Sequence, residues 1–314
     1  MKNLKLFGTA LTAILLCLNF SACSNDDETQ SDNPYAVISY STIDDSTPEL
    51  YKDHSGGVKI ISNKYDKKTG FGKIRFKSDV IVFEQIIEGD KIDYIKLPLT
   101  VEEIGSNAFY CCEELRKLDL PRRVSEIGQE AFKGCYSLTY LAIPEQVTRI
   151  QRGTFDNCSK LEYVKIPKNV TEIGENAFWG CSSLDRSCIS NLDFLENVTE
   201  IGRSAFRDCS SLTSVIVPYR VTSIKSSTFY GCSKLTDISF PKCLTEIHGD
   251  ALNGCSSLKT IKIEATTPPK VYADFSDDIK RNCTLYVPEG YASAYKTAHV
   301  WREFLKIKEV TFIN

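Results

Sequence analysis

The stretch VSEIGQEAFKGCYSLTYLAIPEQ at residues 124–146 is followed directly by VTRIQRGTFDNCSKLEYVKIPKN at residues 147–169, and the two align without a gap. The same unit recurs along most of the chain, with one longer step from Val170 to Val198. Its first slot holds Val101, Val124, Val147, Val170, Val198, Val221 and Leu244, and its aromatic slot holds Phe109, Phe132, Phe155, Phe178, Phe206, Phe229 and Leu252. A fixed period of about 23 residues predicts a solenoid, because each turn must bury its apolar side against the turns above and below.

Each unit predicts two strands joined by a turn. Alternating apolar and variable residues indicate a strand over residues 138–143, and the proline that follows ends the pairing. The shorter V-x-x-I-G stretch indicates a second strand on the opposite side, and A-F-x-x-C a compact turn that fills the interior. One period before the first regular copy, a degenerate eighth copy has Ile81, Ile86, Ile92, Ile95, Leu97 and Pro98 in the matching slots, with Gly89 in place of the cysteine.

Thirteen cysteines would suggest a disulfide framework in an exported protein, but their spacing argues against one. Seven of them occupy one slot of the repeat: Cys112, Cys135, Cys158, Cys181, Cys209, Cys232 and Cys255. An interior slot repeated in every turn favours a small apolar side chain, and a thiol can also cap a turn carbonyl. We therefore expect a structural cysteine ladder. A zinc site is the alternative, but a one-sided ladder offers no tetrahedral set of ligands, and no metal site is predicted. Cys111, Cys188, Cys243 and Cys283 lie off the ladder and could oxidise.

The sequence offers no catalytic constellation. Its only histidines are His54, His248 and His299, which are far apart in the chain, and the motifs of metal hydrolases, acyl transferases and phosphate-binding loops are missing. A formal net charge of -3 gives no reason to expect nucleic acid as a partner. These observations predict a protein that is not an enzyme and needs no cofactor.

The units resemble the BspA-like leucine-rich repeats of bacterial surface proteins, with SEIGQEAFKGCYSLTYLAIP and TEIGENAFWGCSSL as the clearest examples. The resemblance implies a β-rich leucine-rich-repeat solenoid with short helical turns. It also implies an amino-terminal β cap at residues 35–77, repeats at residues 78–264 and a carboxy-terminal strand-helix cap at residues 265–314. The ligands of the family are diverse host or matrix proteins, so the resemblance specifies the fold far better than the ligand.

The first residues predict export and a lipid anchor. Lys2 and Lys5 precede an apolar run from Leu6 to Phe20, which is too short for a comfortable membrane span and is typical of a signal peptide over residues 1–22. Cys23 follows small residues and resembles the lipidated cysteine of bacterial lipoproteins, so we expect it to carry the lipid that holds the chain to the outer membrane. Residues 23–34 predict a flexible tether. Its acidic run resembles a signal for display on the cell surface, although it could be a merely solvated spacer.

Specificity in a solenoid is set by the outward-facing strand positions, since packing fixes the inward ones. One such slot contains Tyr94, Lys117, Tyr140, Tyr163 and Arg186, and the slot two residues further on adds Lys96 and Lys165. Tyrosine and arginine are favoured anchors at protein interfaces, so we expect these seven residues to bind a partner. The alternative is that the tyrosines only suit exposed strands and stack on their neighbours.

These features predict a lipid-anchored surface protein whose strand face binds a protein of a host, a matrix or another cell. The alternative is a glycan-capture or periplasmic scaffold lipoprotein beside a polysaccharide-uptake system, in which Tyr94, Tyr140 and Tyr163 would stack on sugar rings. The sequence does not indicate the oligomeric state.

Overall fold

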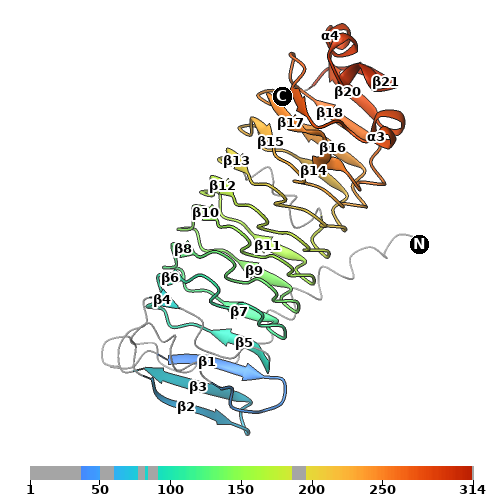
Figure 1. Ribbon diagram of the computed structural model, residues 1–314. Coiled ribbons are helices and arrows are strands. Elements are labelled where there is room, and N and C mark those ends of the chain that lie inside the picture. Colours follow the sequence, from blue (N-terminus) through green and yellow to red (C-terminus); the bar gives the residue numbers. More distant parts are fainter. Residues whose placement is uncertain (1–36, 50–59, 77–81, 84–90, 186–195, 313–314) are drawn as a thin grey trace, which may run out of the picture. The chain divides into compact units, whose positions relative to one another are not determined.

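The computed structural model describes residues 37–49, 60–76, 82–83, 91–185 and 196–312. Within these residues the chain forms successive turns of a β-solenoid, and each regular turn contributes one short strand to each of two rows (Figure 1). The predicted fold class, a β-rich solenoid whose turns follow the sequence repeat, is confirmed. The calls on residues 1–34, including Cys23 and the tether, lie outside the described residues.

The front row contains β5 (Ile92–Lys96), β7 (Lys117–Asp119), β9 (Tyr140–Ala142), β11 (Tyr163–Lys165), β14 (Ser214–Ile216), β16 (Asp237–Phe240), β18 (Thr260–Ile263), β20 (Thr284–Pro288) and β21 (Lys306–Val310). The back row contains β4 (Val82–Phe83), β6 (Glu103–Ile104), β8 (Glu126–Ile127), β10 (Arg149–Ile150), β12 (Glu172–Ile173), β13 (Glu200–Ile201), β15 (Ser223–Ile224), β17 (Glu246–His248) and β19 (Lys270–Tyr272). Paired strands within each row are parallel, since every turn runs in the same direction.

The front strands are shorter than the sequence suggests. In the turn at residues 124–146 the strand covers Tyr140–Ala142 rather than residues 138–143. The amide of Leu138 donates to the carbonyl of Cys135 in its own turn, so the chain at that point still belongs to the bend. Leu141 faces inward between the exposed Tyr140 and Ala142, which is the alternation expected of a half-buried strand.

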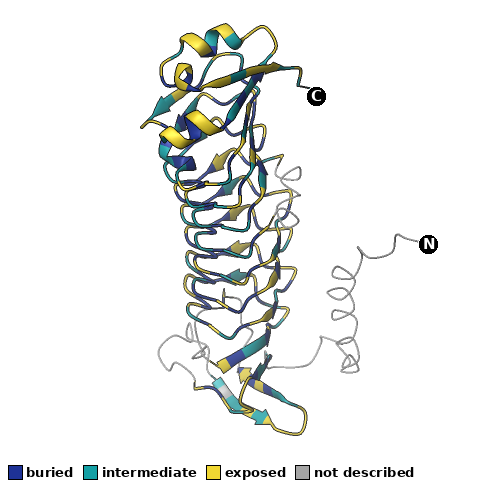
Figure 2. Cartoon of the chain, turned by 90° about the vertical axis from the view of Figure 1, so that its right-hand side faces the viewer, coloured by how far each residue is buried: buried dark blue, intermediate teal, exposed yellow. Residues whose placement is uncertain are grey.

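A column of phenylalanine rings runs through the core. Phe109, Phe132, Phe155, Phe178, Phe206 and Phe229 are all buried, and each ring stacks on the next with centroids 5.2–5.7 Å apart. Figure 2 shows buried residues repeating from turn to turn, with exposed residues between them. Each aromatic slot is therefore packed by the equivalent slots above and below, so the period of the sequence becomes the spacing of the core.

The degenerate first turn differs from the prediction. Phe83 pairs with Ile104, in the slot that the sequence alignment assigned to Ile81, and its ring stacks on Phe109 with centroids 4.8 Å apart. The step along the chain from Phe83 to Ile104 in the back row is therefore shorter than the regular step from Ile104 to Ile127. With this shorter step, the ring of Phe83 covers the end of the phenylalanine column at Phe109. Ile81, Ile86 and Gly89 lie outside the described residues. The front strand keeps the predicted register, with Ile95 beside Leu118.

Both ends of the solenoid are covered. At the amino-terminal end, β1 (Val37–Thr42), β2 (Ile60–Asp66) and β3 (Phe71–Phe76) form an antiparallel sheet, and β1 pairs with β5 to continue the front row. At the other end lie η4 (Gly249–Leu252), α3 (Asp277–Asn282), α4 (Ala292–Thr297) and η5 (Trp301–Glu303). The helical part of this cap is divided between α4 and η5, where Val300 has a positive φ of 69°.

The carboxy-terminal helices seal the last apolar layer. Trp301 is buried, and its indole Nε1 donates to the carbonyl of Pro269 at 2.7 Å. The buried Tyr295 hydroxyl donates to the carbonyl of Ala265, also at 2.7 Å. No helix within the described residues is long and apolar enough to span a membrane.

Candidate functional site

The predicted contact residues that the structure describes lie on the amino-terminal half of the front row. Tyr94 of β5 is in register with Lys117 of β7, and Tyr140 of β9 is in register with Tyr163 of β11. Because β7 also lies against β9, the four side chains form one column on the outward face. Arg186, the fifth residue of this slot, lies outside the described residues. We call Tyr94, Lys117, Tyr140 and Tyr163 the front column.

At its amino-terminal end the front column is tied together by polar contacts. The Tyr94 hydroxyl donates to Asp119 Oδ2 at 2.9 Å, and Lys117 Nζ lies 3.9 Å from Asp119 Oδ1. Lys117 Nζ also lies 5.5 Å from the centroid of the Tyr94 ring. Burial, and then the hydrogen bond and charge of Asp119, raise the pKa of the Tyr94 phenol well above its usual value. The phenol therefore stays protonated and acts as a donor.

The other end of the front column is an aromatic pair. The rings of Tyr140 and Tyr163 are stacked with centroids 5.4 Å apart and an interplanar angle of 4°. Tyr140 is 48% exposed, whereas Tyr163 is half-buried. One face of each ring is thus covered by the other ring. The alternative to partner binding was that the tyrosines stack on their neighbours. This stacking is present, and it leaves a large part of Tyr140 accessible.

Two lysines flank the front column in the neighbouring slot. Lys96 is in register with Asp119, and Lys165 is in register with Ala142. Both lysines are exposed, and Lys165 Nζ lies 3.5 Å from Glu145 Oε1. The predicted residues on β5, β7, β9 and β11 therefore lie together on one aromatic and basic surface.

The repeated cysteines line the interior. From Cys135 to Cys255, each thiol donates to the carbonyl of the phenylalanine one turn earlier, at 3.0–3.2 Å. Burial raises the pKa of Cys158, as it does for the other thiols of this row, so they stay protonated. All ten cysteines in the described part of the chain are free. Cys283, which we expected to be available for oxidation, is wholly buried and donates to the Leu258 carbonyl.

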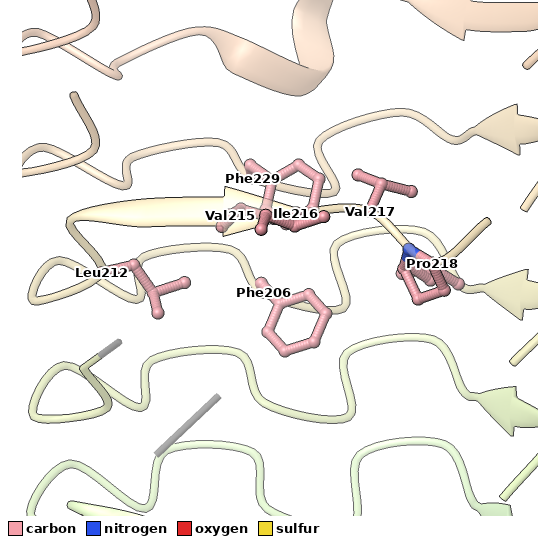
Figure 3. Close-up of a pocket in the computed structure, with 8 residues that line it drawn as sticks. Phe206, Leu212, Val215, Ile216, Val217, Pro218 and Phe229 are labelled. Atoms are coloured by element: carbon pink, nitrogen blue, oxygen red, sulfur yellow. The ribbon is translucent and has the colours of Figure 1, made fainter. Parts of the chain in front are cut away.

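One small apolar cavity lies among the described residues, next to the front row. Figure 3 shows a cavity under β14 that is lined by apolar side chains, among them Phe206, Val215 and Phe229. Its volume is about 10 Å³, and its lining exposes no polar surface. A space of this size scarcely holds one water molecule, and an apolar lining gives that water no partner. Among the described residues, no group of three or more His, Cys, Asp or Glu side chains could hold a metal ion.

A second group of polar and aromatic side chains was missed by the sequence analysis. It occupies the slot directly after the buried phenylalanine, which contains Lys133, Trp179, Arg207 and Tyr230 in different turns. The same slot-by-slot comparison that found the front column would have found these residues. Strand alternation points only to strand positions, whereas this slot lies in the turn.

Comparisons with known proteins place the repeats in a family. The family model described as "BspA type Leucine rich repeat region" matches residues 82–189 and 185–273 in six copies. A leucine-rich-repeat protein of T. pallidum, TpLRR, is 31% identical, covers 58% of this chain and 80% of its own, and has a TM-score of 0.45. A leucine-rich cell-surface protein of Faecalibacterium prausnitzii is 20% identical, covers 69% and 95%, and has a TM-score of 0.25. A leucine-rich-repeat protein of Bacteroides ovatus is 20% identical, covers 68% and 90%, and has a TM-score of 0.23. Among the curated proteins there is no match.

Proposed function

Because the chain belongs to the BspA-type leucine-rich-repeat family, we propose that it is a non-enzymatic, lipid-anchored surface protein whose front column binds a protein partner. The observation that carries the proposal is the column itself, in which three tyrosines and a lysine from four successive turns share one outward face. Such a surface is held in place by the backbone ladder, so it offers a pre-ordered contact area to a macromolecule.

The chemistry of the front column suits a protein partner. Tyrosine contributes a large contact area with few rotatable bonds, and its hydroxyl forms hydrogen bonds at the edge of that area. Lys96, Lys117 and Lys165 add positive charge on the same surface. We therefore expect a partner with acidic side chains around an apolar or aromatic centre, since opposite charges steer and orient the encounter.

The alternative role in glycan capture receives less support from the ring geometry. Sugar rings bind aromatic residues on an open ring face. Here Tyr140 and Tyr163 cover one face of each other, Lys117 lies over Tyr94, and the Phe71 ring is packed edge-on to Tyr94 at 6.1 Å. We rank the glycan alternative second for this reason.

The lipid anchor is the second part of the proposal. Cys23 would carry the lipid, and the tether at residues 23–34 would hold the solenoid away from the outer membrane. A Cys23→Ser variant should lose incorporation of a clickable fatty acid and move from the membrane fraction to the soluble fraction. Protease treatment of intact cells would then determine the leaflet. Digestion of the repeats supports surface display, whereas protection, with a periplasmic control also intact, supports the periplasmic alternative.

The binding role is tested with purified protein on arrays of extracellular-matrix proteins and of polysaccharides. The variant Tyr140→Ala/Tyr163→Ala removes the stacked pair of the front column. The matched control is Ile216→Ala, which removes a side chain that is 52% exposed on β14 of the same row. We expect the double variant to lose binding to a matrix protein by about tenfold or more, and the control to keep it. Loss of polysaccharide binding alone would favour the glycan role, and unchanged binding throughout would refute both uses of this face.

A further inference from the structure

Three side chains from successive turns form an aromatic and cationic cluster at the turn edge of the solenoid, outside the two strand rows. Trp179, Arg207 and Tyr230 each follow a buried phenylalanine of the core column directly. The guanidinium carbon of Arg207 lies 5.4 Å from the Trp179 ring centroid and 4.5 Å from the Tyr230 ring centroid. The guanidinium is thus held by two rings, which restricts its orientation.

Asp208 fixes this cluster from one side. Its Oδ2 accepts a hydrogen bond from Trp179 Nε1 at 3.1 Å and lies 3.4 Å from Arg207 Nε. Asp208 adopts a positive φ of 57°. A Cβ atom added to Gly231 would lie only 2.0 Å from Asp208 Oδ1, so a side chain at position 231 would clash with the carboxylate. The glycine in the next turn therefore makes room for the carboxylate that orients the tryptophan and the arginine.

The terminal nitrogens of Arg207 are left for another partner. Within the described residues its side chain contacts the two rings and forms one ion pair, from Nε to Asp208, and it is 35% exposed. Lys133 occupies the same slot nearer the amino terminus and differs in this respect. Its ammonium group lies 3.4 Å from Glu130 Oε2 and 3.2 Å from Asp156 Oδ2, so two carboxylates already satisfy it.

From this contrast we infer that Trp179, Arg207 and Tyr230 form a second docking point, which binds an aspartate or glutamate carboxylate of a protein partner. The Nη1 and Nη2 groups of Arg207 present a planar pair of donors that matches the two oxygens of a carboxylate. The flanking rings exclude water and supply apolar contact, and tryptophan, tyrosine and arginine are the residue types that dominate binding energy at protein interfaces. The docking point shares no residue with the front column.

The chain contains only two tryptophans, which gives a direct test. In protein labelled with ¹⁵N at tryptophan, the indole signal of Trp179 reports on the cluster, and that of the buried Trp301 serves as the internal reference. A Trp179→Phe variant assigns the two signals. The probes are a capped peptide of glutamate and glycine, its glutamine counterpart, and polygalacturonate, which carries carboxylates on a sugar backbone.

We expect the glutamate peptide to shift the Trp179 signal in a saturable manner and to leave the Trp301 signal in place, with no effect of the glutamine peptide. Arg207→Lys keeps the charge but loses the paired donors, so it should weaken binding by about tenfold. Lys133→Gln, in the same slot, should leave the affinity within about twofold, since its cation is already paired.

Several results would overturn the inference. They are a Trp179 signal that does not move, an equal response to the glutamine peptide, an unchanged affinity of Arg207→Lys, or a response to polygalacturonate alone, which would indicate a glycan ligand. Far-ultraviolet circular dichroism of each variant distinguishes lost binding from lost folding. The indole signal of Trp179 reports only on this docking point. A negative array result for the front column would therefore not affect the peptide titration, and a negative titration would not affect the array result.

Discussion

The phenylalanine column yields a quantitative prediction, with Phe155 at its centre. This ring is fully buried and lies between Phe132 and Phe178, with centroids 5.5 Å and 5.2 Å away. A Phe155→Leu change keeps an apolar side chain, as in the last copy, where Leu252 fills the slot, but it removes two ring contacts. At about 0.5–1.5 kcal/mol for each contact, the free energy of unfolding should fall by about 1–3 kcal/mol.

Phe155→Ala should cost more, because it also removes most of the buried side chain and leaves a cavity. We expect a loss of about 3–5 kcal/mol. The matched control is Tyr140→Ala, which removes the more exposed ring of the stacked pair on the front column and should cost about 1 kcal/mol or less.

The assay is equilibrium unfolding in urea, followed by far-ultraviolet circular dichroism and by tryptophan fluorescence. Trp179 directly follows Phe178, so its emission reports on the layers next to the substitution. Coincident transitions from the two methods would show that the repeats unfold as one cooperative unit. The reasoning is refuted if Phe155→Ala is no more destabilising than Tyr140→Ala, since the phenylalanine column would then contribute nothing beyond surface stacking.

Three further predictions concern thiols, charge and backbone. Iodoacetamide should modify the half-buried Cys111 and Cys243 in the native protein, whereas the eight buried cysteines among those described should react only in urea, as peptide mass spectrometry can show. Lys280→Met should cost about 1–2 kcal/mol, since it leaves three carboxylates without their shared cation. Hydrogen bonds to Glu303 and Asp274 raise the pKa of Lys280, so this stabilisation should be fully present below pH 10.5 and be lost as the pH rises through the raised pKa, which urea unfolding at several pH values can test. Gly231→Ala should lower the unfolding free energy by about 1–2 kcal/mol and shift the Trp179 indole signal, because a Cβ at this positive φ of 74° would displace Asp208.

The repeated part of the fold could be predicted because its contacts repeat with the sequence. Phe132 packs on Phe155 for the same reason that Phe155 packs on Phe178, so one unit specifies all of them. The prediction failed where the repeat is imperfect. At the first turn the slot alignment selected Ile81, whereas packing favoured the larger ring of Phe83, two residues further along.

The candidate site was only partly predictable. Strand alternation placed Tyr94, Tyr140 and Tyr163 on one outward face, and the slot order placed Lys117 among them. Alternation does not specify which neighbour a long side chain will contact. The bond from Tyr94 to Asp119 crosses to the next turn and joins two different slots, so it depends on side-chain geometry as well as on the period.

The sequence by itself determined the solenoid, its period, its two strand rows and the identity of its buried slots, because packing between identical layers is a property of the repeat. Only the tertiary structure decided how the variable side chains pair. Lys133 and Arg207 share one slot, yet two carboxylates pair with the lysine, whereas two aromatic rings and the single carboxylate of Asp208 hold the arginine. The difference comes largely from Asp156, Trp179 and Tyr230, which adjacent turns place beside the two cations and which lie a full turn away along the chain.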